Sequence, residues 1–321
     1  MVRRLLAIIG LFFFIGCDSN EVNTGAGKPS QRDPEVQFRH IGDYPIQMVA
    51  TTGMVADLAR NIGGPHVQVT QLMSDGIDPH QFKASPGDIQ VLSRAQIILY
   101  NGLHLEGKMG DIFERLAKKK AVFAVGEYLA EERILKDENG GYDPHLWFDV
   151  ALWADVATVV EKILVQYDPK HAAEYRQNSE NFRKELLALD AEVRERFASI
   201  PAPQRALVTA HDAFRYFGRA YQVEVRGIQG ISTESEAGVR EINELIDFLK
   251  SRNISAVFVE SSVSDKNLNA LIEGCRAVNH PINNGGTLYS DAMGKEGTPE
   301  GTYIGMIRHN METIDKALRK P

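Results

Sequence analysis

Short apolar runs alternate along the chain with longer stretches whose apolar residues recur at helical spacing. Residues 46–51 form a run of strand type, and residues 54–62 follow with a helical pattern that ends at a Gly-Gly pair. The same alternation predicts strands at 66–72, 96–100 and 121–125, and helices at 85–95 and 106–119. Because alternating strands and helices build a mostly parallel sheet covered on both faces, residues 45–168 are expected to form one α/β lobe.

The same alternation returns in the second half of the chain. It predicts strands at 205–209, 224–228 and 256–260, and helices at 236–251, 264–278 and 302–318. Residues 200–321 are therefore expected to form a second α/β lobe of similar size, and 321 residues are enough for two cores.

A long helical pattern, 169–199, separates the two expected lobes. Its apolar residues step by three, four or seven positions, and neither Gly nor any Pro after the first residue interrupts it before Pro201: Tyr175, Phe182, Leu186, Leu189, Val193 and Phe197. About 31 residues at ~1.5 Å per residue give roughly 46 Å. The expected fold class is thus α/β, with two mostly parallel lobes joined by a single long rigid helix. The alternative is a surface helix packed on one lobe alone.

The N-terminus has the pattern of an export signal. Arg3 and Arg4 precede an apolar run, 5–15, that is too short to span a bilayer. The run ends at Gly16-Cys17, which resembles the site where a bacterial lipoprotein signal is cut and the cysteine is lipidated. We therefore expect a lipoprotein signal peptide at 1–16 and a flexible tether at 17–44, with the body outside the cytoplasm and anchored to the membrane through Cys17. A plain secretory signal with an incidental cysteine is the alternative.

Composition narrows the possible partners and ligands. The formal net charge is −7, without the clustered Lys and Arg that nucleic acid requires, so no nucleic-acid partner is expected. If Cys17 carries lipid, Cys275 has no cysteine left to pair with, and we expect it to be a small buried residue of a monomer. Neither cysteine has metal-binding spacing, so a metal site here must use nitrogen and oxygen ligands.

Histidine occurs in one unusual context twice. The tripeptide Asp-Pro-His ends at His80 and again at His145, although the chain has only nine histidines. His211 follows an expected strand, and Asp291 follows a Gly-Gly turn. Bound molecules and ions lie outside the carboxyl ends of the strands in open parallel sheets. Of the four candidate residues, two fall in each expected lobe, which favours a metal site in the cleft between the lobes. Three imidazoles and a carboxylate suit Zn²⁺ or Mn²⁺, whereas Ca²⁺ and Mg²⁺ prefer oxygen ligands.

Other candidate residues have weaker support. Glu260 ends an expected strand and is either an acceptor that orients a ligand imidazole or a cap of the next helix. His104 precedes an expected helix and could reach the cleft between the lobes, but we favour a surface position at the start of that helix. The other histidines are interpreted as structural: His40, His66, His171, His280 and His309.

Several stretches resemble the TroA/ZnuA-type (cluster A-I) zinc and manganese solute-binding proteins of bacterial ABC importers. They span roughly residues 45–318: DPHQF at 78–82, NGLHLE at 101–106, DPHLWFD at 143–149, TAHDAFRYFGRAY at 209–221, GISTESEAG at 230–238, FVESSVSDKN at 258–267 and SDAMG at 290–294. The resemblance implies two lobes joined by one long helix, with metal ligands at His80, His145, His211 and Asp291. Many manganese receptors of this family have glutamate at the third position, so His211 implies the zinc branch or the mixed zinc/manganese branch. The His-rich loop of many zinc receptors is absent between 127 and 142.

The expected function is capture of Zn²⁺, with Mn²⁺ as the alternative and Fe²⁺ possible, and delivery to an ABC permease with a cytoplasmic ATPase. No catalytic role is expected, and release of the ion is expected to use small movements because a rigid helix resists wide opening. Two other functions stay open. One is a secreted metallohydrolase, and the other is a metal-binding surface adhesin of the same fold.

Overall fold

The computed structural model describes residues 32–137, 140–235 and 237–319. The expected signal peptide at 1–16, Cys17 and the first part of the expected tether lie outside the described residues. Among the residues that the structure does describe, no helix combines the length and apolar character needed to cross a membrane.

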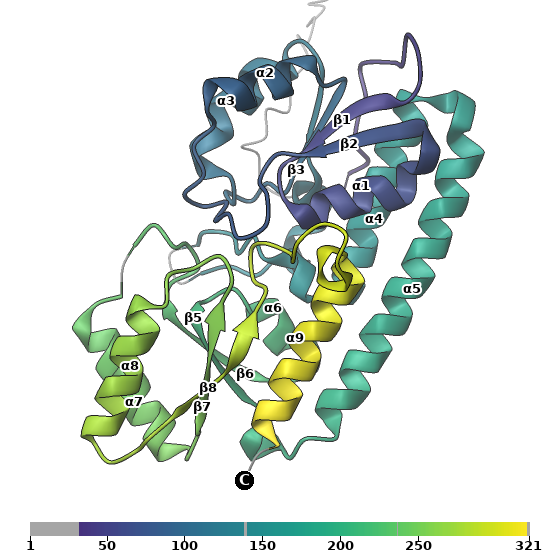
Figure 1. The fold of residues 1–321 in the computed structure, drawn as a ribbon. Helices are drawn as coiled ribbons and strands as arrows, with labels where there is room; N and C mark the ends of the chain where they lie inside the picture. The colour runs from purple at the N-terminus through teal and green to yellow at the C-terminus, as the bar shows by residue number, and fades with distance from the viewer. Residues whose placement is uncertain (1–31, 138–139, 236, 320–321) are drawn as a thin grey trace, which may run out of the picture.

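The first lobe is a parallel four-stranded sheet with helices on its faces (Figure 1). The strands lie in the order β2-β1-β3-β4, so the chain starts in the middle of the sheet and moves outward on both sides. They are β1 (Ile46–Ala50), β2 (Val67–Gln71), β3 (Ile97–Tyr100) and β4 (Ala121–Ala124), and the helices between them are α1 (Gly53–Gly63), α2 (Pro86–Arg94) and α3 (Gly110–Ala117). The helix expected from residue 106 begins later, because residues 107–109 form a 3-10 turn.

The second lobe repeats this arrangement, with strand order β6-β5-β7-β8, again all parallel. Its strands are β5 (Ala206–His211), β6 (Glu224–Gln229), β7 (Ala256–Glu260) and β8 (Asn283–Leu288). Its helices are α6 (Arg215–Tyr221), α7 (Val239–Ser251), α8 (Lys266–Ala277) and α9 (Tyr303–Leu318). The two-lobe α/β fold is thereby confirmed. The sequence pattern did not predict α6, β8 or the long helix α4 (Val150–Tyr167), which ends the first lobe.

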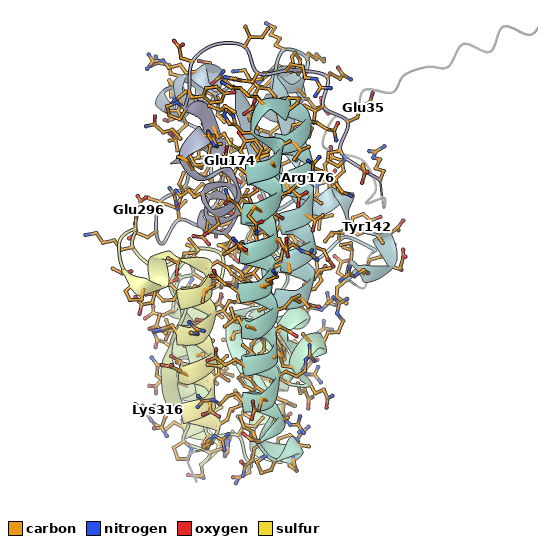
Figure 2. The ribbon with its side chains drawn as sticks, turned by 90° about the vertical axis from the view of Figure 1, so that its right-hand side faces the viewer. Glu35, Tyr142, Glu174, Arg176, Glu296 and Lys316 are labelled. Carbon is orange, nitrogen blue, oxygen red and sulfur yellow. The ribbon has the colours of Figure 1, made fainter. Side chains whose placement is uncertain are left out.

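The expected long helix is α5 (Ala172–Ala198), which follows a 3-10 turn at Pro169–His171 (Figures 1 and 2). Its six apolar residues named above are all buried. The helix contacts α1 and α4 of the first lobe and α6 and α9 of the second. It is therefore a strut between the lobes, and the alternative of a helix packed on one lobe is excluded.

The strut is not the only connection, because one hydrophobic core runs through both lobes. Phe148, just before α4, stacks on Phe214 of the second lobe with ring centroids 4.2 Å apart. Tyr303, at the start of α9, stacks on Trp153 of α4 and donates a hydrogen bond of 2.6 Å to the carbonyl of Trp147. All of these side chains are at most 1% exposed. Separating the lobes would expose this aromatic surface to water.

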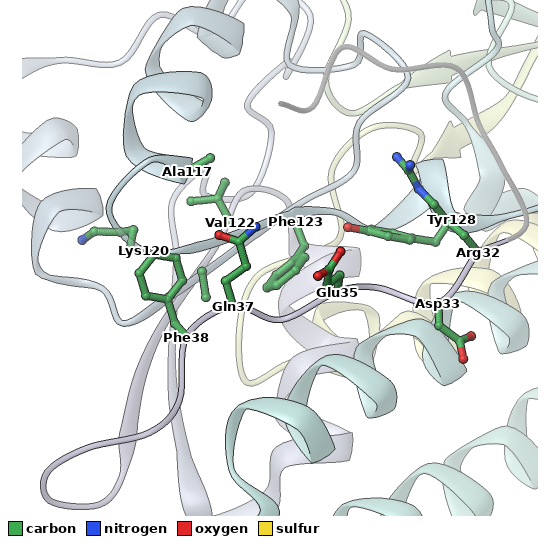
Figure 3. Close-up of a pocket in the computed structure, with 11 residues that line it drawn as sticks. Arg32, Asp33, Glu35, Gln37, Phe38, Ala117, Lys120, Val122, Phe123 and Tyr128 are labelled. Carbon is green, nitrogen blue, oxygen red and sulfur yellow. The ribbon is translucent and has the colours of Figure 1, made fainter. Parts of the chain in front are cut away.

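The part of the expected tether that the structure describes lies against the first lobe. Asp33 pairs with Lys162 of α4, and the Gln166 amide donates a hydrogen bond of 2.7 Å to the carbonyl of Pro34. Farther along, the backbone N–H of His40 donates to the carbonyl of Tyr167 at 2.7 Å. Figure 3 shows this segment bordering a pocket whose other wall includes β4. The chain is thus bonded to the lobe from residue 33 onward, well before β1.

A buried carboxyl in the first lobe predicts a dependence of stability on pH. Burial raises the pKa of Glu127 from 4.5 to about 7, while its Oε1 accepts a hydrogen bond from the N–H of Leu103 at 3.2 Å. Since the folded protein holds this proton more tightly than the unfolded chain, the group's contribution to stability falls as pH rises from about 4.5 to about 7. Glu127→Gln, which keeps an acceptor oxygen, should therefore raise the free energy of unfolding at pH 8 by up to about 3 kcal/mol.

Urea unfolding of the metal-free protein at pH 5 and pH 8 measures this effect. The gain from Glu127→Gln should be small at pH 5 and present at pH 8. A variant less stable than the parent at both pH values would mean that the bond to Leu103 needs the charged carboxylate.

Candidate metal centre

Four side chains from both lobes meet in one buried cluster. His80 lies in the loop after β2, and His145 directly precedes a 3-10 turn, Leu146–Phe148. His211 is the last residue of β5, and Asp291 lies three residues after β8. Potential ligand atoms of all four lie within 4.8 Å of one another. The position of His145 differs from the expected end of a strand: among the described residues no strand directly precedes it, and Lys136 and Tyr142 in the loop before it form an isolated β-bridge.

The spacing of the ligand atoms fits a tetrahedral ion. The Nε2 atom of His145 lies 3.4 Å from the Nε2 atoms of both His80 and His211. The Asp291 carboxylate oxygens lie 3.4 Å from His145 Nε2, 3.2 Å from His211 Nε2 and 3.8 Å from His80 Nε2. A tetrahedral zinc ion with bonds of about 2.05 Å separates its ligand atoms by about 3.3 Å. The cluster is thus already close to the geometry that such an ion imposes.

The Asp291 carboxylate lacks the hydrogen bonds that burial normally demands. The residue is 1% exposed, and within the described residues neither carboxylate oxygen has a hydrogen-bond partner. The polar atoms facing these oxygens are the imidazole Nε2 atoms 3.2–3.8 Å away, and a buried carboxylate without hydrogen bonds is stable only beside a positive charge. A cation bound between Asp291 and the imidazoles would satisfy these oxygens.

Two of the imidazoles are fixed by carboxylates on the side away from the cluster. Asp143 Oδ1 lies 2.8 Å from His145 Nδ1, and Glu260 Oε2 lies 2.5 Å from His211 Nδ1. Glu260 also accepts a hydrogen bond of 2.8 Å from the backbone N–H of His211. Such partners hold Nδ1 protonated, which leaves Nε2 free to bind a metal. No such carboxylate contact is recorded for His80 within the described residues.

The repeated Asp-Pro-His tripeptide has a local structural cause. In each copy the aspartate Oδ1 accepts a hydrogen bond from the backbone N–H of the histidine two residues later, at 2.9 Å for His80 and 3.1 Å for His145. The sequence analysis did not predict this role of Asp78 and Asp143. The identical Asp at the start of both copies was the available signal.

Residues distant in the sequence brace the ligand loops. The Asn101 amide donates to the carbonyl of Pro144 at 3.0 Å, and the Tyr216 hydroxyl donates to that of Asp143 at 3.0 Å. Across the lobes, the Trp147 indole N–H donates to the carbonyl of Ser290 at 3.0 Å, next to Asp291. These hydrogen bonds were not predicted, although all of the residues that form them lie in the motifs quoted for the resemblance.

The loop of His80 is bonded directly to the opposite lobe. The Thr233 hydroxyl donates to Asp78 Oδ2 at 2.6 Å, and the Gln81 amide lies 3.3 Å from the same hydroxyl. An ion pair also links the two lobes here, between Lys108 of the first lobe and Glu234 of the second, at 2.9 Å. His80 is 4% exposed, the highest of the four, so it borders the route between the cluster and solvent.

The ionisation of the cluster reflects strong burial opposed by nearby charges. Burial lowers the pKa of His80 to about 3. Burial also disfavours the charged form of His145, but the hydrogen bond to Asp143 and the charge of Asp291 outweigh it and raise the pKa to about 9. The pKa of Asp291 falls well below its usual range, because the charge of His211 outweighs burial. Without metal, the negative carboxylates therefore favour positive charge on His145 and His211, whose pKa values are raised, while His80 stays neutral.

The remaining candidates lie outside the cluster. His104 is exposed, in a left-handed backbone conformation with φ of 66°. His280 and His309 make ring contacts to the carbonyls of Ile254 and Thr287. Cys275 is buried, and Cys17 lies outside the described residues.

Two α/β lobes that close over one buried cluster of three imidazoles and a carboxylate define the class of two-lobe metal receptors. The chain belongs to the family of the periplasmic zinc-uptake complex component A, whose model matches residues 48–317. The resemblance seen in the sequence motifs is thereby confirmed.

Relatives with sequence and structural similarity come from Bacillus subtilis and Treponema pallidum. The manganese-binding lipoprotein MntA of Bacillus subtilis (strain 168) is 48% identical over 278 residues, which cover 86% of this chain and 91% of that protein. The zinc-binding protein TroA of Treponema pallidum (strain Nichols) is 45% identical over 273 residues, covering 85% of this chain and 89% of that protein. A solved structure of the periplasmic zinc-binding protein TroA from Treponema pallidum matches with a TM-score of 0.84, covering 86% of this chain and 100% of that one.

Proposed function

We propose that this protein captures a divalent transition-metal ion between its lobes and delivers it to an ABC permease driven by a cytoplasmic ATPase. His80, His145, His211 and Asp291 would bind the ion as cargo. The observation that carries the proposal is the buried Asp291 carboxylate, whose oxygens have no hydrogen-bond partner among the described residues and face three imidazoles. The family membership supports the same function.

Zinc is the proposed cargo, with Mn²⁺ as the alternative and Fe²⁺ as a weaker one. Three nitrogen ligands and one carboxylate favour zinc over manganese in intrinsic affinity. Relatives named for each metal are similar to this chain, at 48% identity for the manganese-binding MntA and 45% for the zinc-binding TroA. A bidentate Asp291 would expand the coordination shell and favour manganese.

The cluster supports transport rather than catalysis. A catalytic zinc usually keeps three protein ligands and an open position for water, whereas here a fourth protein ligand closes the tetrahedron. The alternative of a secreted metallohydrolase therefore has no observation in its favour, and nothing in the described surface specifically favours an adhesin.

Metal analysis of the purified mature chain by mass spectrometry, combined with competition between zinc and manganese, tests the proposed cargo. We expect one tightly bound zinc ion that equimolar manganese does not displace. Manganese retained against zinc would identify manganese as the cargo, and a protein that binds neither ion tightly would overturn the proposal.

We further propose that the protein is a monomer, anchored by lipid on Cys17 and located outside the cytoplasm. The lipobox-like end of the signal pattern at 14–17 supports this location. Cys17→Ser should move the protein from the membrane fraction to the soluble fraction of cells. Retention of Cys17→Ser in the membrane fraction would contradict lipid anchoring at this residue.

Glu260 is expected to set the affinity of the site without touching the ion. Glu260→Gln keeps one oxygen for the backbone N–H of His211 but removes the second acceptor, which faces Nδ1. Losing such a partner typically weakens metal binding about 10–100-fold. Competition with a chromophoric zinc chelator measures the change. Glu273→Gln, on the exposed face of α8, is the matched control and should leave the affinity unchanged.

A further inference from the structure

A second group of metal-ligating side chains lies at the junction of the strut with the first lobe. His66 ends the 3-10 turn after α1, His171 ends the 3-10 turn before α5, and Glu174 lies in the first turn of α5. Potential ligand atoms of the three lie within 4.8 Å of one another. Figure 2 shows Glu174 near one end of the strut. All three residues belong to elements outside the cluster between the lobes.

The side chains of this group are in direct contact. Glu174 Oε2 lies 2.8 Å from His66 Nε2. The rings of His66 and His171 stack with centroids 3.7 Å apart and 16° between their planes. The imidazoles are 18% and 14% exposed and Glu174 is 58% exposed, so solvent reaches the group directly.

A buried carboxylate orients one of these imidazoles. Asp168 Oδ2 lies 2.7 Å from His171 Nδ1, and Asp168 is only 2% exposed. Asp168 also accepts hydrogen bonds from the hydroxyls of Tyr175 and Tyr44, at 2.7 and 2.9 Å. Burial raises the pKa of Asp168, but these hydrogen bonds outweigh it and lower the pKa below its usual value. The carboxylate thus occupies Nδ1 of His171 and leaves Nε2 available, the arrangement that orients histidine ligands in metal sites.

The local charge also suits a cation. Asp168 and Glu174 are two carboxylates beside two imidazoles. A nearby cation, Lys170, has its Nζ over the ring of Tyr44, 5.1 Å from its centroid. A divalent ion would take the place of the direct contact between His66 and Glu174 and balance the two carboxylates. Two nitrogen ligands and one carboxylate favour zinc and its neighbours over Mg²⁺ or Ca²⁺.

We propose that His66, His171 and Glu174 form a second, solvent-accessible site for a divalent transition ion such as Zn²⁺, with His171 oriented by Asp168. Rotation of His66 out of the stack, with His171 held by Asp168, would bring the ligand atoms toward bonding distances of about 2.0–2.2 Å. Three protein ligands leave a position for water, so the ion exchanges with solvent more readily than one enclosed between the lobes. Since all three ligands lie at the junction of the first lobe with the strut, loading requires no movement of the second lobe.

Calorimetric titration of the full mature chain with Zn²⁺ tests this site. The parent protein should take up two equivalents, the second more weakly than the first. His171→Gln and His66→Gln should each lose the second equivalent and keep the first, and the retained first equivalent shows that the variants fold. His104→Asn, which changes an exposed histidine elsewhere, should still take up two.

Anomalous scattering at the zinc edge from zinc-soaked crystals locates the ion directly. The expected result is a peak between His66, His171 and Glu174 in addition to the peak between the lobes. The proposal is overturned if the parent binds a single equivalent, or if the second equivalent persists in His171→Gln. Either result leaves the first equivalent, and thus the proposed transport site, unaffected.

Discussion

Replacing His211 with alanine is expected to weaken zinc binding by roughly 100- to 1,000-fold. Structural zinc sites with four ligands bind with about 10–16 kcal/mol, so each ligand contributes about 3–4 kcal/mol. At 1.4 kcal/mol per factor of ten, this corresponds to a loss of roughly two to three orders of magnitude. The effect should be large at His211 because its imidazole is completely buried and fixed by Glu260 on its other side. Competition with a zinc chelator of known affinity measures the loss.

A second substitution separates loss of a ligand from loss of the fold. His211→Ala leaves Glu260 buried without its imidazole partner, which is itself destabilising. Asp291→Asn has nearly the same shape and removes only the negative charge, so it should fold and still bind zinc much more weakly. His104→Asn controls for the loss of a histidine at the surface. If Asp291→Asn and His211→Ala both bind zinc within tenfold of the parent, the cluster between the lobes is not the cargo site.

Removal of the metal is expected to destabilise the whole protein. An ion that binds only the folded state stabilises it by about 4 kcal/mol at a free concentration 1,000-fold above its dissociation constant. For a chain of this size, that corresponds to about 5–10 °C in melting temperature. Because the ligands come from both lobes, a single ion ties together segments from residue 80 to residue 291.

Calorimetric melts in the presence of excess zinc and of a chelator measure this difference. The parent protein should melt at a higher temperature with zinc, and most of the shift should disappear in His211→Ala. Equal shifts in the parent and in His211→Ala would assign the stabilisation to ions bound elsewhere.

Most of the fold could be predicted because seven of the eight strands are either short apolar runs or, as in β2 and β6, segments that mix apolar and polar residues at strand spacing. The missed strand, β8, contains Asn283-Asn284-Gly285-Gly286, which is typical of a turn. It lies at the edge of its sheet, where one side has no neighbouring strand and such residues are tolerated. Helix α4 was missed because it is buried on most of its surface, so its apolar residues form no single stripe.

The ligands were easier to predict than the residues that support them. His80 and His145 can be recognised in the sequence because each ends a repeated local motif, whose hydrogen bonds join residues only two positions apart. The supporting bonds join distant segments: Asn101 and Pro144 are 43 residues apart, and Trp147 and Ser290 are 143 apart. A hydrophobic pattern describes which face of an element is buried. It contains no information on which side chain meets a given carbonyl across the molecule.

The shared aromatic core has a consequence for how this chain can change in evolution. The strut offers an obvious point at which to join the first half of one relative to the second half of another. Phe148 and Phe214, however, lie on opposite sides of that point and stack on each other, as Trp147 and Tyr303 are bonded across it. The two halves are therefore not interchangeable modules, and a chimera would need matching aromatic residues on both sides of its junction.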